Sequence, residues 1–188
     1  MPFAFQRRRG TTAQHASFTG LLGELTVDTD KNTVVVHNGS LAGGYPLARE
    51  KGGTLTDAVV RGLEEDVNIV ASAATGTINF EVSTASIWYY TSNATANHTL
   101  NFRYSSAVSL NTALATGDTI TLVWLNTNGT TAYYPSTINI DGTSITPKWQ
   151  GGTAITAGNA SSIDVYVFTI IKTASATFTV LASQTKFA

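Results

Sequence analysis

The sequence contains no cysteine among its 188 residues. This absence excludes disulfide bonds, thiolate metal sites and cysteine nucleophiles, so the stability of the fold cannot depend on redox state. Long apolar runs are lacking too: none approaches the roughly 20 residues that a membrane-spanning helix needs, and we predict no membrane insertion. The formal net charge is −1, which gives no electrostatic reason to expect a nucleic-acid partner.

Charged residues are scarce beyond residue 66. The last 122 residues hold eight of them: Arg103, Lys148, Lys172, Lys186, Glu81, Asp118, Asp141 and Asp164. The first 66 residues hold the other 15. Such a change in composition indicates a domain boundary. We therefore divide the chain into residues 1–50, residues 51–66 and residues 67–188.

Residues 1–50 contain the pattern of a β-hairpin. Leu25 and Val27 alternate with polar residues, and Val34 and Val36 do the same after a turn rich in Asp and Asn over residues 28–32. Asp and Asn side chains hydrogen-bond their own backbone and favour tight reversals. We predict a hairpin over residues 23–40.

The same turn resembles the start of a calcium-binding loop. Asp28, Asp30 and Asn32 stand at the spacing of the first three ligands. The glycine and the terminal glutamate of such a loop are missing at the required spacing, so we favour a hairpin turn and predict no metal site.

Residues 51–66 contain the one helix that the sequence predicts. Leu55, Val59 and Leu63 recur at four-residue spacing over about three turns. Gly62 and the acidic residues at its C-terminal end weaken this helix. We expect a short helical linker that needs a partner surface.

Residues 67–188 consist of strand and turn patterns. Apolar residues alternate over segments such as 76–83, 98–104 and 119–125, and Asp141-Gly142 predicts a type I′ hairpin turn. Short strands at regular spacing favour an antiparallel β-sandwich or jelly-roll-like knob. Residues 163–171 are apolar on both faces, as in a strand that is central in a sandwich or covered by a neighbouring subunit. The fold class is therefore all-β.

Catalytic patterns are absent from the sequence. His15, His37 and His98 lie far apart without a metal-binding partner at ligand spacing, and we expect them at the surface or in turns. Asp118 and Asp141 stand in turn patterns, and Asp164 begins a strand. We predict no catalytic residue, no cofactor and no enzyme activity.

Two groups of residues are candidates for binding. Arg7, Arg8 and Arg9 form either a solvated tail or a docking peptide that pairs with acidic groups of a partner protein. Adjacent aromatic residues form either a platform for sugar or protein recognition or a surface between subunits. These aromatic residues are Trp88, Tyr90, Tyr133, Tyr134 and Trp149.

The N-terminal sequence resembles a known module. Arg8-Arg9-Gly10-Thr11, Gly23-Glu24-Leu25, Asp28-Thr29-Asp30 and Asn38-Gly39 follow one another in the order found at the start of phage tail fibres and related virion proteins. The match covers about a quarter of the chain. Residues 149–188 resemble tail-fibre-like virion structural proteins of marine cyanophages in their Thr/Ala/Ser-rich, strand-forming sequence.

The resemblance implies a non-enzymatic virion protein. It implies a homotrimer that is synthesised in the host cytoplasm, attached to other virion proteins through its N-terminal module, and equipped with a projecting C-terminal domain for host adsorption. The receptor would be a glycan or a protein of the host surface. Two alternatives stay open: a decoration protein of the capsid or neck with a purely structural role, and a glycan depolymerase, which the scarcity of acidic residues disfavours.

Overall fold

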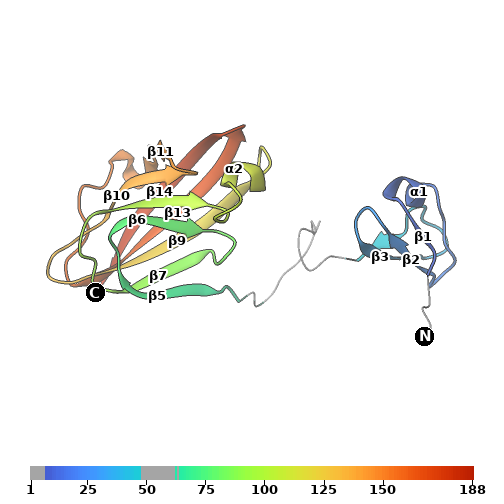
Figure 1. Ribbon diagram of the computed structural model, residues 1–188, viewed down its shortest axis with the longest axis horizontal. Coiled ribbons are helices and arrows are strands. Elements are labelled where there is room, and N and C mark those ends of the chain that lie inside the picture. The colour runs from blue at the N-terminus through green and yellow to red at the C-terminus, as the bar shows by residue number, and fades with distance from the viewer. Residues whose placement is uncertain (1–6, 48–61, 63) are drawn as a thin grey trace. The chain divides into compact units, whose positions relative to one another are not determined.

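The computed structural model describes residues 7–47, residue 62 and residues 64–188. The chain forms two compact units, Met1–Gly62 and Leu63–Ala188, which we call the N-terminal and C-terminal units (Figure 1). Most of the predicted helical linker, residues 51–61 and residue 63, lies outside the described residues. Residues 64–66, the end of that prediction, belong to no helix or strand.

Within residues 7–47, the N-terminal unit is a small four-stranded sheet with one short helix. Its strands lie in the order β1-β2-β3-β4, with β1 parallel to β2 and the other pairs antiparallel. The element bounds are β1 Arg9–Gly10, α1 Thr12–Ala16, β2 Leu25–Asp28, β3 Thr33–Val36 and β4 Tyr45–Pro46.

The predicted hairpin is confirmed as the β2-β3 pair. Leu25 lies opposite Val36 and Val27 opposite Val34. The turn is closed by the Asp28 carboxylate, whose Oδ1 accepts hydrogen bonds from the backbone N–H groups of Asp30 (3.0 Å) and Lys31 (3.1 Å). Asn32 at the end of the turn has a φ of 48°, a conformation that asparagine tolerates well. Turn chemistry therefore explains the Asp and Asn residues of this segment.

The structure contains two short helices that the sequence analysis did not predict, α1 and α2 (Leu110–Ala113). Each is about one turn long, too short for an apolar period to show. Their ends carry the missed signal. Thr11 caps α1 in a reciprocal capping box with Gln14, and the Ser109 side chain accepts from the Thr112 backbone N–H to cap α2.

The C-terminal unit is a two-sheet β-sandwich (Figure 1). A six-stranded sheet has the order β12-β14-β13-β9-β7-β5, and a four-stranded sheet has the order β11-β10-β8-β6. The element bounds are β5 Val67–Ala73, β6 Gly76–Glu81, β7 Ile87–Ser92, β8 His98–Arg103, β9 Thr119–Asn128, β10 Pro135–Ile140, β11 Thr143–Ile145, β12 Lys148–Trp149, η1 Gln150–Gly152, β13 Ser162–Ala174 and β14 Thr177–Phe187.

The all-β prediction is confirmed, but the prediction of antiparallel sheets is wrong for much of the sandwich. Strands β5 to β10 alternate between the two sheets along the chain. Each strand therefore returns to its own sheet in the same direction, so β5, β7 and β9 run parallel, as do β6, β8 and β10. A strand of the opposite sheet makes each crossover, where a helix is more usual. Antiparallel pairing is found in β10-β11 and in β9-β13-β14.

The parallel stacking reveals an internal repeat. The tetrapeptides Thr-Ile-Asn-Phe (77–80), Thr-Leu-Asn-Phe (99–102) and Thr-Ile-Asn-Ile (137–140) lie in register on β6, β8 and β10. The apolar second and fourth positions point into the sandwich and are buried, while Thr and Asn lie on the outer face. Like residues therefore stack in rows across the four-stranded sheet.

The core of the sandwich is rich in aromatic rings. Phe80 stacks on Trp88 with centroids 5.0 Å apart, and Phe102 contacts both Phe80 and Phe168. On β13, the aromatic row of Tyr166 and Phe168 faces this core and is fully buried. The valine row of the same strand faces outward.

Candidate functional site

The N-terminal unit is held together by a buried chain of polar side chains. The Gly20 backbone N–H donates to His37 Nδ1 (3.3 Å), and His37 Nε2 lies 2.9 Å from Thr26 Oγ1. Thr26 Oγ1 lies 2.8 Å from His15 Nε2, and His15 Nδ1 lies 3.0 Å from the Thr11 carbonyl oxygen. One arrangement of protons satisfies all four contacts, with each N–H or O–H group donating to the next acceptor along the chain.

The expectation of surface or turn histidines is therefore wrong. His15, His37 and His98 are 6%, 1% and 2% exposed. Spacing in sequence could not show this, since Thr26 on the hairpin joins two histidines from either side of it. The close packing also explains Gly20, where a Cβ atom would lie 2.6 Å from the His37 ring.

Among the candidate docking residues Arg7, Arg8 and Arg9, the last two are part of the fold of the N-terminal unit. Arg9 belongs to β1, and the Arg8 carbonyl oxygen accepts from the Val27 backbone N–H at 2.9 Å. The Arg8 guanidinium lies 3.1 Å from the Glu24 carboxylate and 4.8 Å from the centre of the Phe18 ring. All three arginines are exposed to solvent. From Arg8 onward the segment is thus an ordered edge strand, which differs from a solvated tail.

A shallow cleft of about 260 Å³ lies beside these arginines. It combines two guanidinium groups with the Phe18 ring and the buried histidine network. Such a surface suits an acidic or carbonyl-rich segment of a partner protein. The cleft is lined by Arg8, Arg9, Gly10, Gln14, His15, Phe18 and Thr26.

Asp28 is a buried acidic residue of this unit. Burial opposes its charge, but hydrogen bonds from the Lys31 backbone, the Thr12 hydroxyl and the Asp30 backbone, together with nearby His15, outweigh that effect and lower the pKa of Asp28. Its Oδ2 accepts from Thr12 Oγ1 at 2.8 Å. Both oxygens of this carboxylate therefore already bind protein donors.

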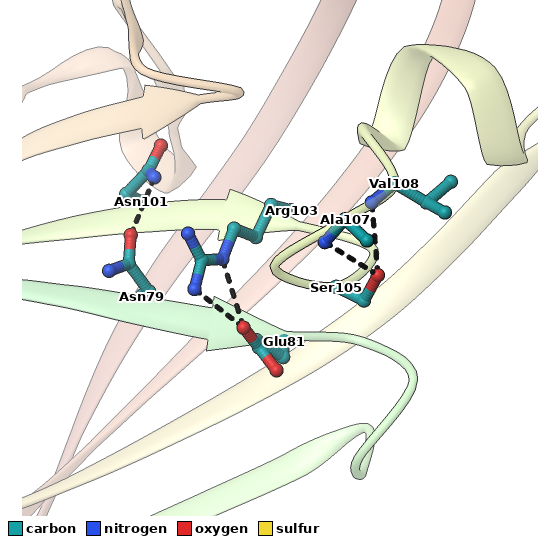
Figure 2. A network of polar contacts seen from close by, with 7 residues as sticks. All are labelled: Asn79, Glu81, Asn101, Arg103, Ser105, Ala107 and Val108. Atoms are coloured by element: carbon teal, nitrogen blue, oxygen red, sulfur yellow. Dashed lines mark hydrogen bonds and ion pairs between the residues drawn. The ribbon is translucent and has the colours of Figure 1, made fainter.

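The outer face of the four-stranded sheet is polar and ordered (Figure 2). Asn101 Nδ2 donates to Asn79 Oδ1 at 2.8 Å, along the row in which the repeated asparagines stack. One step further along the strands, Glu81 Oε1 accepts from Arg103 Nη2 (2.6 Å) and Nε (3.1 Å). These two side chains are about a quarter exposed.

The loop that follows β8 continues this polar surface. Ser105 Oγ accepts from the backbone N–H groups of Ala107 (3.3 Å) and Val108 (3.0 Å) (Figure 2). The hydroxyl closes the loop without secondary structure. The outer face of this sheet therefore carries several polar groups held by hydrogen bonds, the kind of surface that a polar ligand can contact.

The predicted aromatic residues do not form one surface. Trp88 is 8% exposed and lies in the core, which is not where a recognition platform needs it. Tyr90, Tyr133, Tyr134 and Trp149 are partly buried and pack against the core. Tyr89, which the prediction passed over, is the residue of the 88–90 group that faces outward. A binding role for the five predicted residues stays a prediction.

Two of the acidic residues singled out from the sequence, Asp164 and Asp118, have structural partners. Asp164 is fully buried, and its carboxylate accepts from the backbone N–H of Asn159 (2.8 Å) and from the Asn159 and Asn128 side chains. Tyr166 also donates to it at 3.3 Å, and burial followed by the Asp164 charge raises the pKa of Tyr166. Asp118 closes a turn by accepting from the Ala115 backbone N–H.

Within residues 7–47 and 64–188, no three His, Asp or Glu side chains gather as a metal site would require. In the same part of the chain, no helix has the length and apolar character to span a membrane.

Comparison with known proteins places relatives at the N-terminal unit. The family described as Major tropism determinant N-terminal domain matches residues 6–41. A tail fiber receptor-binding protein of Bordetella phage BPP-1 is 71% identical over 49 residues, which are 26% of this chain and 13% of that protein. Solved structures of the Major Tropism Determinant M1 and I1 variants are 73% identical over 24% of this chain and 12% of theirs, with a TM-score of 0.24. The chain is thus similar to its curated relative over a small part of that protein's length.

Proposed function

We propose that this chain is a bacteriophage virion structural protein of the tail-fibre type. Its N-terminal unit would attach it to other virion proteins, and its C-terminal unit would project as a knob for host adsorption. The observation that carries the proposal is the 71% identity over 49 residues to a tail fiber receptor-binding protein. The residues of the matching family domain, 6–41, belong to the N-terminal unit.

The structures of the two units support separate roles in attachment and in host adsorption. The N-terminal unit buries a specific hydrogen-bond chain through His15, Thr26 and His37, and backbone pairing with β2 holds β1 and its arginines in place. The C-terminal unit has an independent hydrophobic core and an ordered polar outer face. A unit that docks and a unit that binds elsewhere can then vary separately.

The proposal includes a homotrimer without enzyme activity, located on the virion and synthesised in the host cytoplasm. The receptor would be a glycan or a protein of the host surface, and the origin from a cyanophage stays a prediction. Depolymerase activity is disfavoured because Asp118, Asp141 and Asp164 each bind structural partners, and Glu81 is paired with Arg103.

The docking role of the arginines can be tested by reversing one charge. Arg9→Glu leaves the β1 backbone intact and places an acidic group beside the cleft, so we expect the full-length variant to be lost from purified particles. Lys31→Glu makes the same change of charge on the exposed turn of the same unit and should be incorporated normally. Quantitative mass spectrometry of particles measures both. Equal incorporation of the two variants would remove the docking role.

A further inference from the structure

The outer face of the six-stranded sheet lacks charge over its breadth. Register places Ile87, Val123 and Val167 in one row across β7, β9 and β13, and Tyr89, Leu125 and Val165 in the next row. The outward positions of β14 are Thr, Leu, Ser or Phe residues, and those of β5 continue the two rows with Val67 and Ile69. Five neighbouring strands therefore present a face of aliphatic, aromatic and small polar side chains.

This face is open in the C-terminal unit as described. Ile69 is 67% exposed, Leu181 is 43% exposed and Phe187 is 57% exposed. The other outer face of the same sandwich carries the asparagine row and the Glu81–Arg103 pair. Both outer faces belong to strands that bury their other side in the sandwich. Their different composition therefore indicates that the two outer faces contact different environments. A sheet face that stays in water carries mainly polar residues, and a face with rows of exposed apolar side chains marks an interaction surface.

Charge appears at the two margins of this face and has opposite sign there. Lys148 on the edge strand β12 lies in register with Leu181, beside a groove of about 360 Å³ that Val167 also lines. At the other edge, Glu65 precedes β5 and its carboxylate accepts from Ser86 Oγ at 3.0 Å. An uncharged centre with a cationic margin and an anionic margin is complementary to a second copy of itself placed around a rotation axis.

We propose that the outer face of the six-stranded sheet is the interface between copies of this chain. Around a closed axis, the β12 margin of one copy meets the β5 margin of the next, and the uncharged rows meet at the centre. Five strands about 4.8 Å apart, over about eight residues of about 3.3 Å each, cover roughly 600 Å² in projection. Side chains corrugate that area, and a stable interface takes about 800 Å² of accessible surface from each partner.

The inference locates the self-association that the proposed function includes. It leaves the polar face of the four-stranded sheet directed outward, where a host ligand can reach it. A second copy fits this face better than a different partner, because the charges of its two margins are opposite in sign and its centre carries no charge that would repel an identical face. A lipid surface fits it less well, since it would favour several cationic groups around the apolar rows.

The test is the mass of the full-length chain in solution, measured by sedimentation velocity at micromolar concentration. We expect the wild-type protein to be oligomeric and Leu125→Glu to be monomeric, because a carboxylate in the second row would be buried without a partner. Thr99→Glu is the matched control: Thr99 is half-buried on β8, at the centre of the other outer face, and this variant should stay oligomeric.

A second variant guards against misfolding. Leu125→Thr keeps a strand-forming residue and adds no charge, so it should fold like the wild type and raise the concentration needed for assembly about tenfold or more. Circular dichroism checks the fold of each variant. Folded Leu125→Glu and Leu125→Thr proteins that assemble like the wild type, or loss of assembly in Thr99→Glu, would overturn the assignment of this face.

A monomeric wild-type chain would overturn the inference together with the trimeric part of the proposed function. Attachment to the particle is read separately, by the Arg9→Glu experiment, and so a failure of the virion role is distinguishable from a failure of this interface.

Discussion

At the scale of single residues, His98 is a buried base without a complete set of partners. Its side chain lies in the core beside the Trp124 ring, with centroids 5.6 Å apart. Nδ1 lies 3.4 Å from the Ala96 carbonyl oxygen, and Nε2 is buried with no hydrogen-bond partner among the described atoms. Burial lowers the pKa of His98 to about 4, against a partial opposing effect of the Ala96 carbonyl.

This lowered pKa predicts acid sensitivity of the C-terminal unit. As the pH falls below about 6.5, the unfolded chain takes up a proton at His98 before the folded chain does. The free energy of unfolding of the C-terminal unit therefore keeps its full value above about pH 6.5. It falls by on the order of 2–3 kcal/mol as the pH drops toward the folded-state pKa of about 4. Replacement by phenylalanine, His98→Phe, should flatten the pH dependence in this window.

Tryptophan fluorescence during urea unfolding measures this prediction in the C-terminal unit alone. All three tryptophans, Trp88, Trp124 and Trp149, lie in that unit. An identical pH dependence in the His98→Phe variant and the wild type would contradict the role given to His98.

At the scale of elements, helix α2 is fixed at both ends by residues far away in sequence. The Asp141 carboxylate accepts from the backbone N–H groups of Leu110 (2.7 Å) and Asn111 (2.9 Å) at its N-terminal end. Lys172 on β13 donates from Nζ to the carbonyl oxygens of Asn111 (2.5 Å) and Leu114 (2.8 Å) at its C-terminal end. A four-residue helix has no stability of its own, so these contacts hold it in place.

Removal of the Lys172 amine should release this element. Lys172→Met keeps the length of the side chain but leaves two carbonyl oxygens without their donor, which costs about 1–3 kcal/mol. We expect faster hydrogen exchange over residues 109–116 and a matching loss in the free energy of unfolding. Lys186→Met, on an exposed position of β14, is the control and should change neither quantity. Unchanged exchange in Lys172→Met would show that packing alone holds α2.

The strands and the tight turns could be predicted from the sequence, because the patterns that indicate them are local. The Asp141-Gly142 turn has φ values of 51° and 81°, as its residue types predict. The sequence could not predict which strands pair with each other or which side of each strand faces the core. Strand β13 is apolar on both sides, and alternation alone cannot tell whether Tyr166 or Val167 faces the core. For the same reason Trp88 was expected at the surface and lies inside.

One feature of the sequence could have predicted the parallel stacking. The repeated Thr-Ile/Leu-Asn-Phe/Ile tetrapeptides at residues 77, 99 and 137 place identical residues side by side only if their strands are parallel and in register. Unequal spacing of the three copies conceals the repeat. The buried histidine network could not be predicted, because it needs the three-dimensional approach of α1 to the hairpin.

At the scale of the whole molecule, the chain joins a small polar-cored unit to a larger sandwich with two unlike outer faces. The N-terminal unit carries the similarity to a tail fiber domain and an ordered arginine edge. In the sandwich, the uncharged face would meet other copies, and the polar face would be directed toward the host. Without cysteine, cohesion of such an assembly depends on packing and hydrogen bonds.

The most direct test of the tail-fibre assignment is a cryo-electron microscopy reconstruction of the particle that carries this chain. We expect density for the N-terminal unit against the tail, with three copies of the sandwich beyond it, joined by their six-stranded sheets. Density for this chain on the capsid surface or neck, with both units in contact with the shell, would contradict the tail-fibre assignment and favour a decoration protein.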